Sequence, residues 1–203
     1  MLLSAALLAD LILGLGLFAV IILTVYVTKR FKNAWVNRKI IHLSTVPAVI
    51  AYMYFFKEPY VFFSFSIFFT VMLILPHLRG SELRWFQIKD NYGEVFYCIS
   101  FAILSMAMWN LDRVFAGLVM LFMAVGDSVT GLIRSRFLKR RGKHWTGTVV
   151  MFLVCSLIGF YFLSYDGILL ALAATLAERQ PWLDDNLSVP LITTLMGLFL
   201  RLY

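Results

Sequence analysis

The sequence predicts an all-α, polytopic integral membrane protein that folds as a helical bundle. Of its 203 residues, 62% are hydrophobic and 14% are charged, whereas a soluble domain averages about 45–50% apolar and about 25% charged residues. Several apolar runs approach the length of about 20 residues that a helix needs to cross a bilayer. Backbone polar groups in lipid must be hydrogen-bonded within the segment, so each crossing is expected to be a helix. The length fits a single transmembrane domain over residues 1–203.

The apolar runs divide the chain into about eight predicted spans. The first run has neither a basic segment before it nor a small-residue cleavage site, so we expect it to be retained as a span. The seventh, GILLALAATLA, is short, and a re-entrant helix is the alternative to a full crossing. The predicted spans lie near residues 5–28, 40–57, 59–76, 93–111, 114–133, 147–163, 166–178 and 188–203.

The basic residues predict the orientation of these spans. With eight crossings, fifteen of the 18 Lys and Arg residues fall on one side of the membrane and three on the other. Because Lys and Arg accumulate in cytoplasmic loops, we expect the polar loops to face the cytoplasm and both termini to lie outside. The net charge of +7 comes from short loops between apolar runs. This pattern favours anionic membrane lipids or a phosphorylated substrate as partners and argues against nucleic acid.

Two polar clusters open the second and fourth spans. Arg38, Lys39 and His42 are spaced to share one face of a helix. Their cations could hold substrate phosphates or, alternatively, only anchor the helix to lipid headgroups. Glu94, in the segment YGEV, could orient one of these cations or simply stabilise the amino-terminal end of its helix.

An acidic residue lies inside the fifth apolar run. A carboxylate near the middle of a membrane helix costs about 2.5–3.5 kcal/mol on insertion scales, so Asp127 is expected to face protein or water and to be functional. Ser128 follows it directly. Gly126 and Gly131 are expected to leave room for a ligand that approaches closely. The alternative is that Asp127 only pairs with a neighbouring helix.

A basic segment follows this run and precedes the sixth span. Residues 134–143 contain six cations and no acidic residue, a density that could neutralise a triphosphate or bind anionic lipid. Gly147 and Thr148 resemble parts of a phosphate-binding loop in composition, but their spacing is not that of a P-loop. The candidate phosphate-binding residues of this region are Arg134, Arg136, Arg140, Lys143, Gly147 and Thr148.

An acidic segment connects the seventh and eighth spans. Asp184, Asp185 and Asn186 follow Glu178, and directly before a span they could cap a helix. Paired carboxylates at a membrane face also suit Mg²⁺, which takes oxygen ligands and keeps substrate phosphates in its coordination shell. Together with Asp127, these acids face one strongly basic segment. A Mg²⁺–nucleotide needs that combination, carboxylates for the metal and cations for the phosphates.

Five segments, taken in order, resemble the motifs of the polyprenol kinase family, which includes dolichol kinase and phytol kinase and is similar to the membrane CTP-transferases. They are RKIIH, YGEVFY, GDSVTGLI, GKHWTGT and the stretch from Glu178 to Pro190 that contains DDNLSVP. The resemblance implies a prenyl alcohol as acceptor (phytol, geranylgeraniol or a longer polyprenol or dolichol), CTP as phosphoryl donor, and Mg²⁺ as cofactor. Thr146 stands where dolichol-kinase-like members have Glu, which is nearer the phytol kinase branch. His144 and Arg134 also depart from the family pattern.

This resemblance implies a CTP-dependent polyprenol kinase of isoprenoid lipid metabolism, with its active-site loops on the cytoplasmic face. Asp127 would hold Mg²⁺, and Asp184 or Asp185 would complete the metal shell or accept the hydroxyl proton. Glu94, Glu178 and Asn186 would orient the other groups. The phosphates would be bound by Lys143 together with Arg38, Lys39, His42, Ser128, Arg134, Arg136, Arg140, Gly147 and Thr148.

Two other functions are compatible with the sequence. A CTP-dependent cytidylyltransferase would use the same metal and nucleotide, but it would make a CDP-lipid by attack at the α-phosphorus. A small transporter could use Asp127 as an ion site. The absence of internal repeats and the one-sided charge argue against the transporter.

Overall fold

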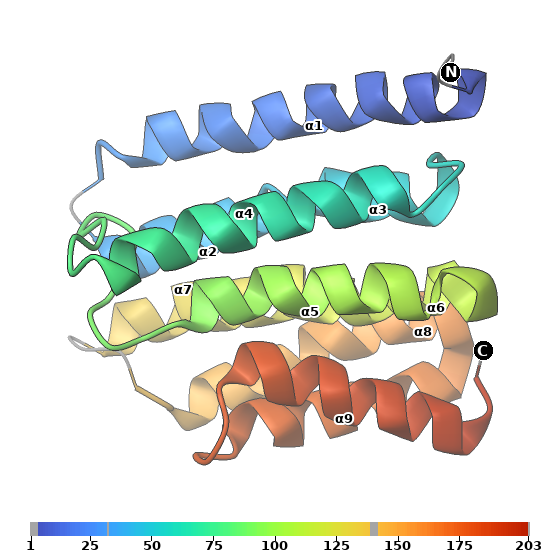
Figure 1. The fold of residues 1–203 in the computed structure, drawn as a ribbon. Coiled ribbons are helices and arrows are strands. Elements are labelled where there is room, and N and C mark those ends of the chain that lie inside the picture. Colours follow the sequence, from blue (N-terminus) through green and yellow to red (C-terminus); the bar gives the residue numbers. More distant parts are fainter. Residues whose placement is uncertain (1–3, 32, 139–141, 203) are drawn as a thin grey trace.

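The computed structural model describes residues 4–31, 33–138 and 142–202. Within these ranges the chain forms helices that run roughly along one common direction (Figure 1), and its β structure is limited to an isolated bridge between Ile88 and Asn91. The predicted all-α architecture is confirmed. The elements are α1 (Ala5–Thr28), α2 (Ala34–Leu43), α3 (Val46–Tyr54), α4 (Tyr60–Leu78), α5 (Gly93–Ala107), α6 (Trp109–Leu121), the π-helical turn η1 (Phe122–Asp127), α7 (Ser128–Phe137), α8 (Trp145–Arg179) and α9 (Asp185–Leu200).

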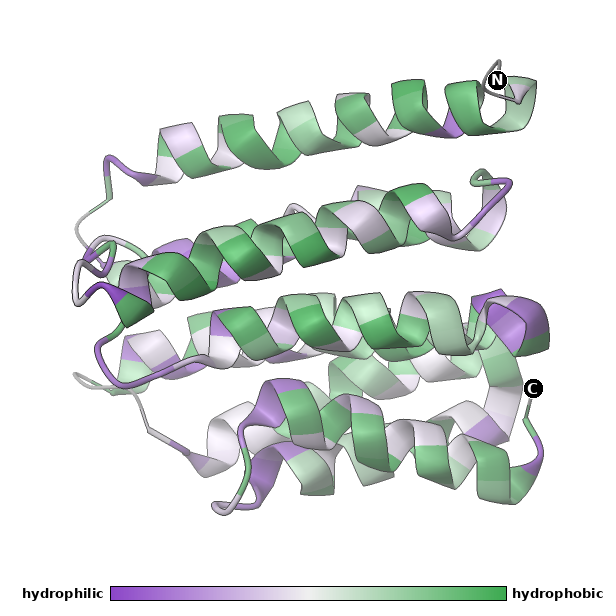
Figure 2. Ribbon diagram, viewed as in Figure 1, coloured by the Kyte–Doolittle hydropathy of each residue, from purple (hydrophilic) through white to green (hydrophobic). Residues whose placement is uncertain are grey.

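Within the described residues, four helical stretches are long and apolar enough to cross a membrane: α1, α4, the continuous stretch Trp109–Phe137, and α8. The helices α5 and α9 are apolar but shorter. Figure 2 shows hydrophobic residues along all of these helices and hydrophilic residues concentrated in the connections. The structure therefore supports an integral membrane protein, whereas the count of eight spans and the side that each loop faces stay predictions.

The polar connections gather at one end of the bundle. The connections from α4 to α5 and from α8 to α9 lie at this end, as do the last turns of α1 and α7 and the first turns of α2 and α8, whereas the start of α1 and the end of α9 lie at the opposite end (Figure 1). Side chains far apart in the sequence are thereby brought to one place. We call this the loop end of the bundle.

The second predicted span, residues 40–57, is divided into two helices. Asn33 begins α2, since its Oδ1 accepts hydrogen bonds from the backbone N–H groups of Trp35 and Val36. Pro47 lies in the first turn of α3, where a residue without an N–H is tolerated. The division lets α2 extend beyond the predicted start and places its polar residues deep in the bundle.

The sixth and seventh predicted spans are the two limbs of α8. The backbone leaves helical geometry at Leu163 and Ser164, where Ser164 has a φ of 51°. Gly159 and Gly167 lie on either side of this break, and their backbones are in direct contact. A straight helix would hold these two glycines about 12 Å apart at 1.5 Å per residue, so the chain reverses here (Figure 1). The second limb runs as a continuous helix to Arg179.

The stretch Trp109–Phe137 forms the centre of the bundle. In its most apolar window 78% of residues are buried, compared with 11% for α1, so the central stretch packs on protein while α1 lies at the edge. The π-helical turn η1 interrupts this stretch and ends at Asp127. Such turns are rare and occur frequently at functional sites. Burial of the central stretch requires Asp127 to find its partners within the protein.

Candidate functional site

A cavity of about 440 Å³, which we call the polar cavity, opens at the loop end beside the connection between α8 and α9. This volume lies within the range of about 300–1,000 Å³ found for small-molecule sites. Three carboxylates and three cations share its walls. The lining residues are Trp35, Lys39, Asp127, Gly131, Arg134, Gly142, Lys143 and residues 180–185.

A buried ion pair joins α2 to the end of η1. The Lys39 ammonium donates a hydrogen bond to Oδ2 of Asp127, and both side chains are more than nine-tenths buried. A buried charge needs a partner of opposite sign, so each residue holds the other in place. Gly131, one turn after Asp127, leaves space for the aliphatic stem of Lys39. The sequence-based expectation that Gly126 leaves room for a ligand is wrong, since a Cβ there would meet the sulfur atoms of Cys155 and Met151.

His42 lies near this pair but does not line the polar cavity. Its Nδ1 is 3.8 Å from Oδ2 of Asp127, which is longer than a hydrogen bond. Its ring stacks on Tyr97 with a centroid separation of 4.0 Å. Neither ring nitrogen has a hydrogen-bond partner among the described residues. His42 therefore lines an apolar space behind the ion pair, whereas Lys39 lines the polar cavity.

Arg38 and Glu94 form the centre of a second buried network. Nη1 of Arg38 lies 3.1 Å from Oε2 of Glu94 and donates a hydrogen bond of 2.6 Å to Asn91. The other Glu94 oxygen lies 2.7 Å from Nε2 of His77 and accepts a hydrogen bond from Gln87. Glu94 therefore orients Arg38 rather than lying unpaired at the start of α5. The sequence analysis missed His77, Gln87 and Asn91, which come from the loop and helix preceding α5.

Arg134 and Glu178 form a two-point ion pair between α7 and the end of α8. The two guanidinium nitrogens lie 2.5 and 3.1 Å from the two carboxylate oxygens. Glu178 is fully buried, and Arg134 is 5% exposed and lines the polar cavity. Gly147 makes the arrangement possible, because a side chain at this position would collide with the Arg134 guanidinium. Gly147 thus acts through Arg134, since it does not line the cavity itself.

The remaining walls of the polar cavity come from Lys143 and the acidic connection. The Lys143 ammonium donates hydrogen bonds to the backbone carbonyls of Glu178 and Gln180. Asp184 caps α9, with Oδ1 accepting hydrogen bonds of 3.0 and 2.8 Å from the backbone and side-chain nitrogens of Asn186. Asn186 also donates to Asp185. The cap leaves the carboxylates of Asp184 and Asp185 on the cavity wall.

Several residues predicted for the phosphate site lie elsewhere. Arg136 is exposed on α7, and Thr148 is half-buried on α8, and neither lines the polar cavity. Ser128 is fully buried, and its hydroxyl has no hydrogen-bond partner among the described residues. Arg140 lies outside the described residues. The cavity instead includes Trp35 and the Gln180–Trp182 turn, which the sequence analysis did not single out.

The carboxylates of the polar cavity fit a metal–nucleotide better than a free ion. Among the described residues there is no group of three His, Cys, Asp or Glu side chains close enough to hold a metal ion alone. Mg²⁺ commonly binds through one or two carboxylates together with waters and substrate phosphates. Asp127, Asp184 and Asp185 line one cavity with cations nearby, which meets that requirement.

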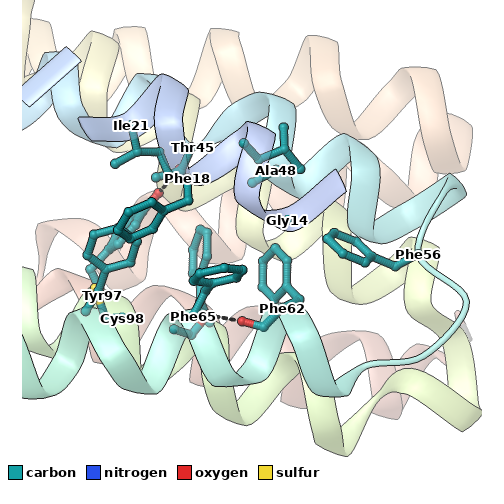
Figure 3. A pocket seen from close by; sticks show the side chains of 14 residues that line it. Gly14, Phe18, Ile21, Thr45, Ala48, Phe56, Phe62, Phe65, Tyr97 and Cys98 are labelled. Atoms are coloured by element: carbon teal, nitrogen blue, oxygen red, sulfur yellow. Dashed lines mark hydrogen bonds between the residues drawn. The ribbon is translucent and has the colours of Figure 1, made fainter. Parts of the chain in front are cut away.

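An aromatic chamber of about 70 Å³ lies between α1 and the rest of the bundle. Figure 3 shows Phe18 and Ile21 of α1 near Thr45, Tyr97 and Cys98 at one end of this chamber. An adjoining space of about 130 Å³ reaches His42 and Glu94. Both spaces are narrow and apolar, and they share no lining residue with the polar cavity among the described residues.

Comparison with known proteins connects this geometry to a family. The chain is 28% identical to the phytol kinase of Synechocystis sp., over 91% of its own length and 90% of that protein. The chain is thus similar to a phytol kinase along nearly its whole length. It is also 32% identical to a probable chloroplastic phytol kinase of Triticum aestivum, over 53% of this chain and 44% of that protein. The family resemblance seen in the five motifs is thereby confirmed.

Other comparisons add less. An uncharacterized protein of Methanocaldococcus jannaschii is 32% identical over 51% of this chain and 56% of its own length. No family model and no solved structure matches the chain. The assignment to phytol kinase-like proteins therefore rests on the curated relatives and on the motifs that contribute the polar cavity.

Proposed function

We propose that this protein is a membrane prenol kinase that transfers the γ-phosphoryl group of CTP to a prenyl alcohol such as phytol or geranylgeraniol. Similarity to a phytol kinase along nine-tenths of both chains supports the reaction class. The single structural observation that carries the proposal is the polar cavity, where Asp127, Asp184 and Asp185 face Lys39, Arg134 and Lys143. We place this cavity on the cytoplasmic side, where the positive-inside pattern puts the loops.

Carboxylates and cations have separate tasks in this reaction. Asp127 with Asp185 or Asp184 would hold Mg²⁺, which when bound neutralises charge on the β- and γ-phosphate oxygens. Lys39, Arg134 and Lys143 would bind the remaining phosphate oxygens. The bidentate contact with Glu178 fixes the plane of the Arg134 guanidinium. Arg134 is therefore oriented before the nucleotide binds.

The transfer itself needs an alcohol oxygen in line with the γ-phosphorus. A bond forms between the alcohol oxygen and this phosphorus, the bond from phosphorus to the β–γ bridging oxygen breaks, and CDP leaves. Asp184 or Asp185, which line the cavity, would take the hydroxyl proton. Positioning and electrostatic stabilisation supply most of the rate enhancement in such transfers.

The cytidylyltransferase alternative requires additional cations for an anionic lipid acceptor. Arg38 and Lys39 are the sequence candidates for this role. In the structure Arg38 is buried against Glu94 and does not line the polar cavity, and Lys39 is one of the cations that the triphosphate itself would occupy. A neutral alcohol needs no further cation, which favours the kinase. A transporter finds no support among the relatives that carry a described activity.

Reconstituted protein in lipid nanodiscs tests the proposal. With CTP and Mg²⁺, we expect CDP to appear only when phytol or geranylgeraniol is added, and omission of Mg²⁺ to abolish it. Replacing CTP by ATP, GTP or UTP tests the donor. CDP release at the same rate with and without every prenol would contradict the proposed acceptor class.

A further inference from the structure

A further apolar space, which we call the α5–α9 groove, lies between α5 and α9. Its volume of about 420 Å³ falls in the range of small-molecule sites and is about six times that of the aromatic chamber. It is lined almost entirely by apolar atoms. The lining residues are Ser100, Ile103, Leu104, Ala107, Met108, Leu183, Leu187, Pro190, Leu191 and Thr194.

The α5–α9 groove adjoins the polar cavity at Leu183. Leu183 lines both spaces, and the next residue, Asp184, lines the polar cavity. The top of α5 packs directly against this point, because a side chain added at Gly93 would meet Oδ2 of Asp184. Ser100 fixes the two helices below it by donating a hydrogen bond of 2.6 Å to the Asn186 carbonyl. The loop-end limit of the groove therefore lies next to Asp184.

The groove is open toward the surrounding lipid along its length. Ile103 on α5 is 60% exposed and Leu191 on α9 is 53% exposed. An apolar molecule dissolved in a bilayer could enter from the side without crossing a polar surface. The aromatic chamber is smaller and, among the described residues, has no lining residue in common with the polar cavity.

We propose that the α5–α9 groove binds the isoprenoid tail of the acceptor, with the hydroxyl at Leu183 and Asp184 and the tail running toward Ala107. This inference rests on the proposed prenol kinase function and names where that site takes its substrate. From Asp185 to Thr194 the helix rises about 14 Å at 1.5 Å per residue. The first isoprene units lie inside this length, and the far units of a longer prenol meet Ala107 and Met108 at its end.

Filling the far end of the groove tests this placement. Ala107 is exposed at the end of α5, so Ala107→Phe adds volume without disturbing the core. We expect kcat/KM for geranylgeraniol to fall about tenfold, the scale of a small steric misfit in an apolar pocket, while farnesol stays within about twofold of the parent protein. Leu157→Phe adds a ring at a 75% exposed site on α8 and is the matched control. Ala48→Leu fills part of the aromatic chamber and tests whether the isoprenoid tail binds there instead.

Binding can be mapped independently of turnover. A geranylgeraniol analogue with a diazirine near the end of its tail is photolysed with the protein in nanodiscs, and the modified peptides are identified by mass spectrometry. We expect adducts within residues 100–108 and 187–194 that excess geranylgeraniol removes. Competed adducts on α1 or α4, or groove adducts that excess prenol leaves unchanged, would overturn the placement.

The two proposals fail in different ways. Competed groove adducts without any CDP release would keep the prenyl site and reject the kinase. CDP release with competed adducts elsewhere, or with a chain-length preference that Ala48→Leu alters and Ala107→Phe does not, would keep the kinase and reject the groove.

Discussion

Lys39 on α2 and Asp127 at the end of η1 form a buried ion pair that also lines the polar cavity. The pair links two motifs that are 88 residues apart in the sequence. It gives Asp127 two functions, because the carboxylate both balances a buried ammonium and faces the space where we place the nucleotide. Substitutions at this position therefore affect stability and activity together.

Asp127→Asn is expected to lower turnover by about 10²–10³-fold, the cost of removing one preorganised electrostatic contact. It is also expected to destabilise the fold by about 3–5 kcal/mol, because Lys39 is left buried without its partner. From the sequence alone, neutralising Asp127 is expected to leave stability unchanged or slightly raised, and the ion pair reverses that expectation. Thermal unfolding in detergent and CDP release measure the two effects separately.

The double variant Lys39→Met/Asp127→Asn separates these effects. Removing both charges is expected to recover most of the lost stability, since a buried pair is commonly replaceable by apolar groups. Activity is expected to stay absent. A double variant that is stable and active would remove Asp127 from the proposed metal site.

Gly147→Ala is expected to displace Arg134 from Glu178, since the added Cβ would collide with the guanidinium. Overpacking of this kind costs about 1–3 kcal/mol, and the apparent affinity for CTP should fall with it. Gly16→Ala is the control, because this exposed helical glycine has no neighbour within 4 Å of an added Cβ. That change is expected to be neutral or stabilising by up to about 1 kcal/mol. Equal effects of the two substitutions would contradict the role given to Arg134.

Lys143→Ala is expected to raise the KM for CTP about tenfold, because a hydrogen bond to a charged group contributes about 1.5–3 kcal/mol. Arg136→Ala serves as the control. Arg136 belongs to the same basic segment, but it is exposed and does not line the polar cavity. Its KM for CTP should stay within about twofold of the parent value. If both variants raise the KM for CTP equally, the basic segment acts only through its overall charge, and the direct phosphate contact assigned to Lys143 is wrong.

Single cysteines test the predicted topology. In a chain with Cys98 and Cys155 replaced by Ser, we introduce Arg136→Cys at the loop end and Asn110→Cys at the opposite end. A membrane-impermeant thiol reagent added to intact cells is expected to label the cysteine at position 110 and to spare the one at 136. Labelling of position 136 alone would reverse the orientation, and equal labelling would reject it.

The all-α fold and most of the polar cavity could be predicted from the sequence. Apolar runs, loop charges and an isolated carboxylate in a membrane helix are local signals, so α1, α4 and Asp127 were accessible without a structure. The partners of the buried charges could not be predicted from the sequence, because Lys39 contacts Asp127 and Arg38 contacts Glu94 only after distant helices pack together. Composition alone predicts Arg136 and Thr148 as phosphate-binding residues, but neither lines the cavity, because composition does not show which helix face meets it.

The reversal of the chain within α8 also depends on a contact that the sequence alone does not show. A gap between two apolar runs predicted the boundary, but the tight turn at Ser164 depends on the contact between Gly159 and Gly167. Sequence spacing cannot report how closely two helix limbs approach. The acceptor groove was likewise hidden, since its two walls come from α5 and α9.

The most direct test of the central claim follows the phosphorus atoms of CTP. Reconstituted protein is incubated with Mg²⁺, geranylgeraniol and CTP labelled with ³²P at either the γ or the α position, and the lipids are then extracted. We predict that label from γ-labelled CTP enters the lipid phase and that label from α-labelled CTP stays in the aqueous phase as CDP. Lipid-phase label from α-labelled CTP with a phosphatidate acceptor, and none from γ-labelled CTP with any prenol, would contradict the kinase assignment.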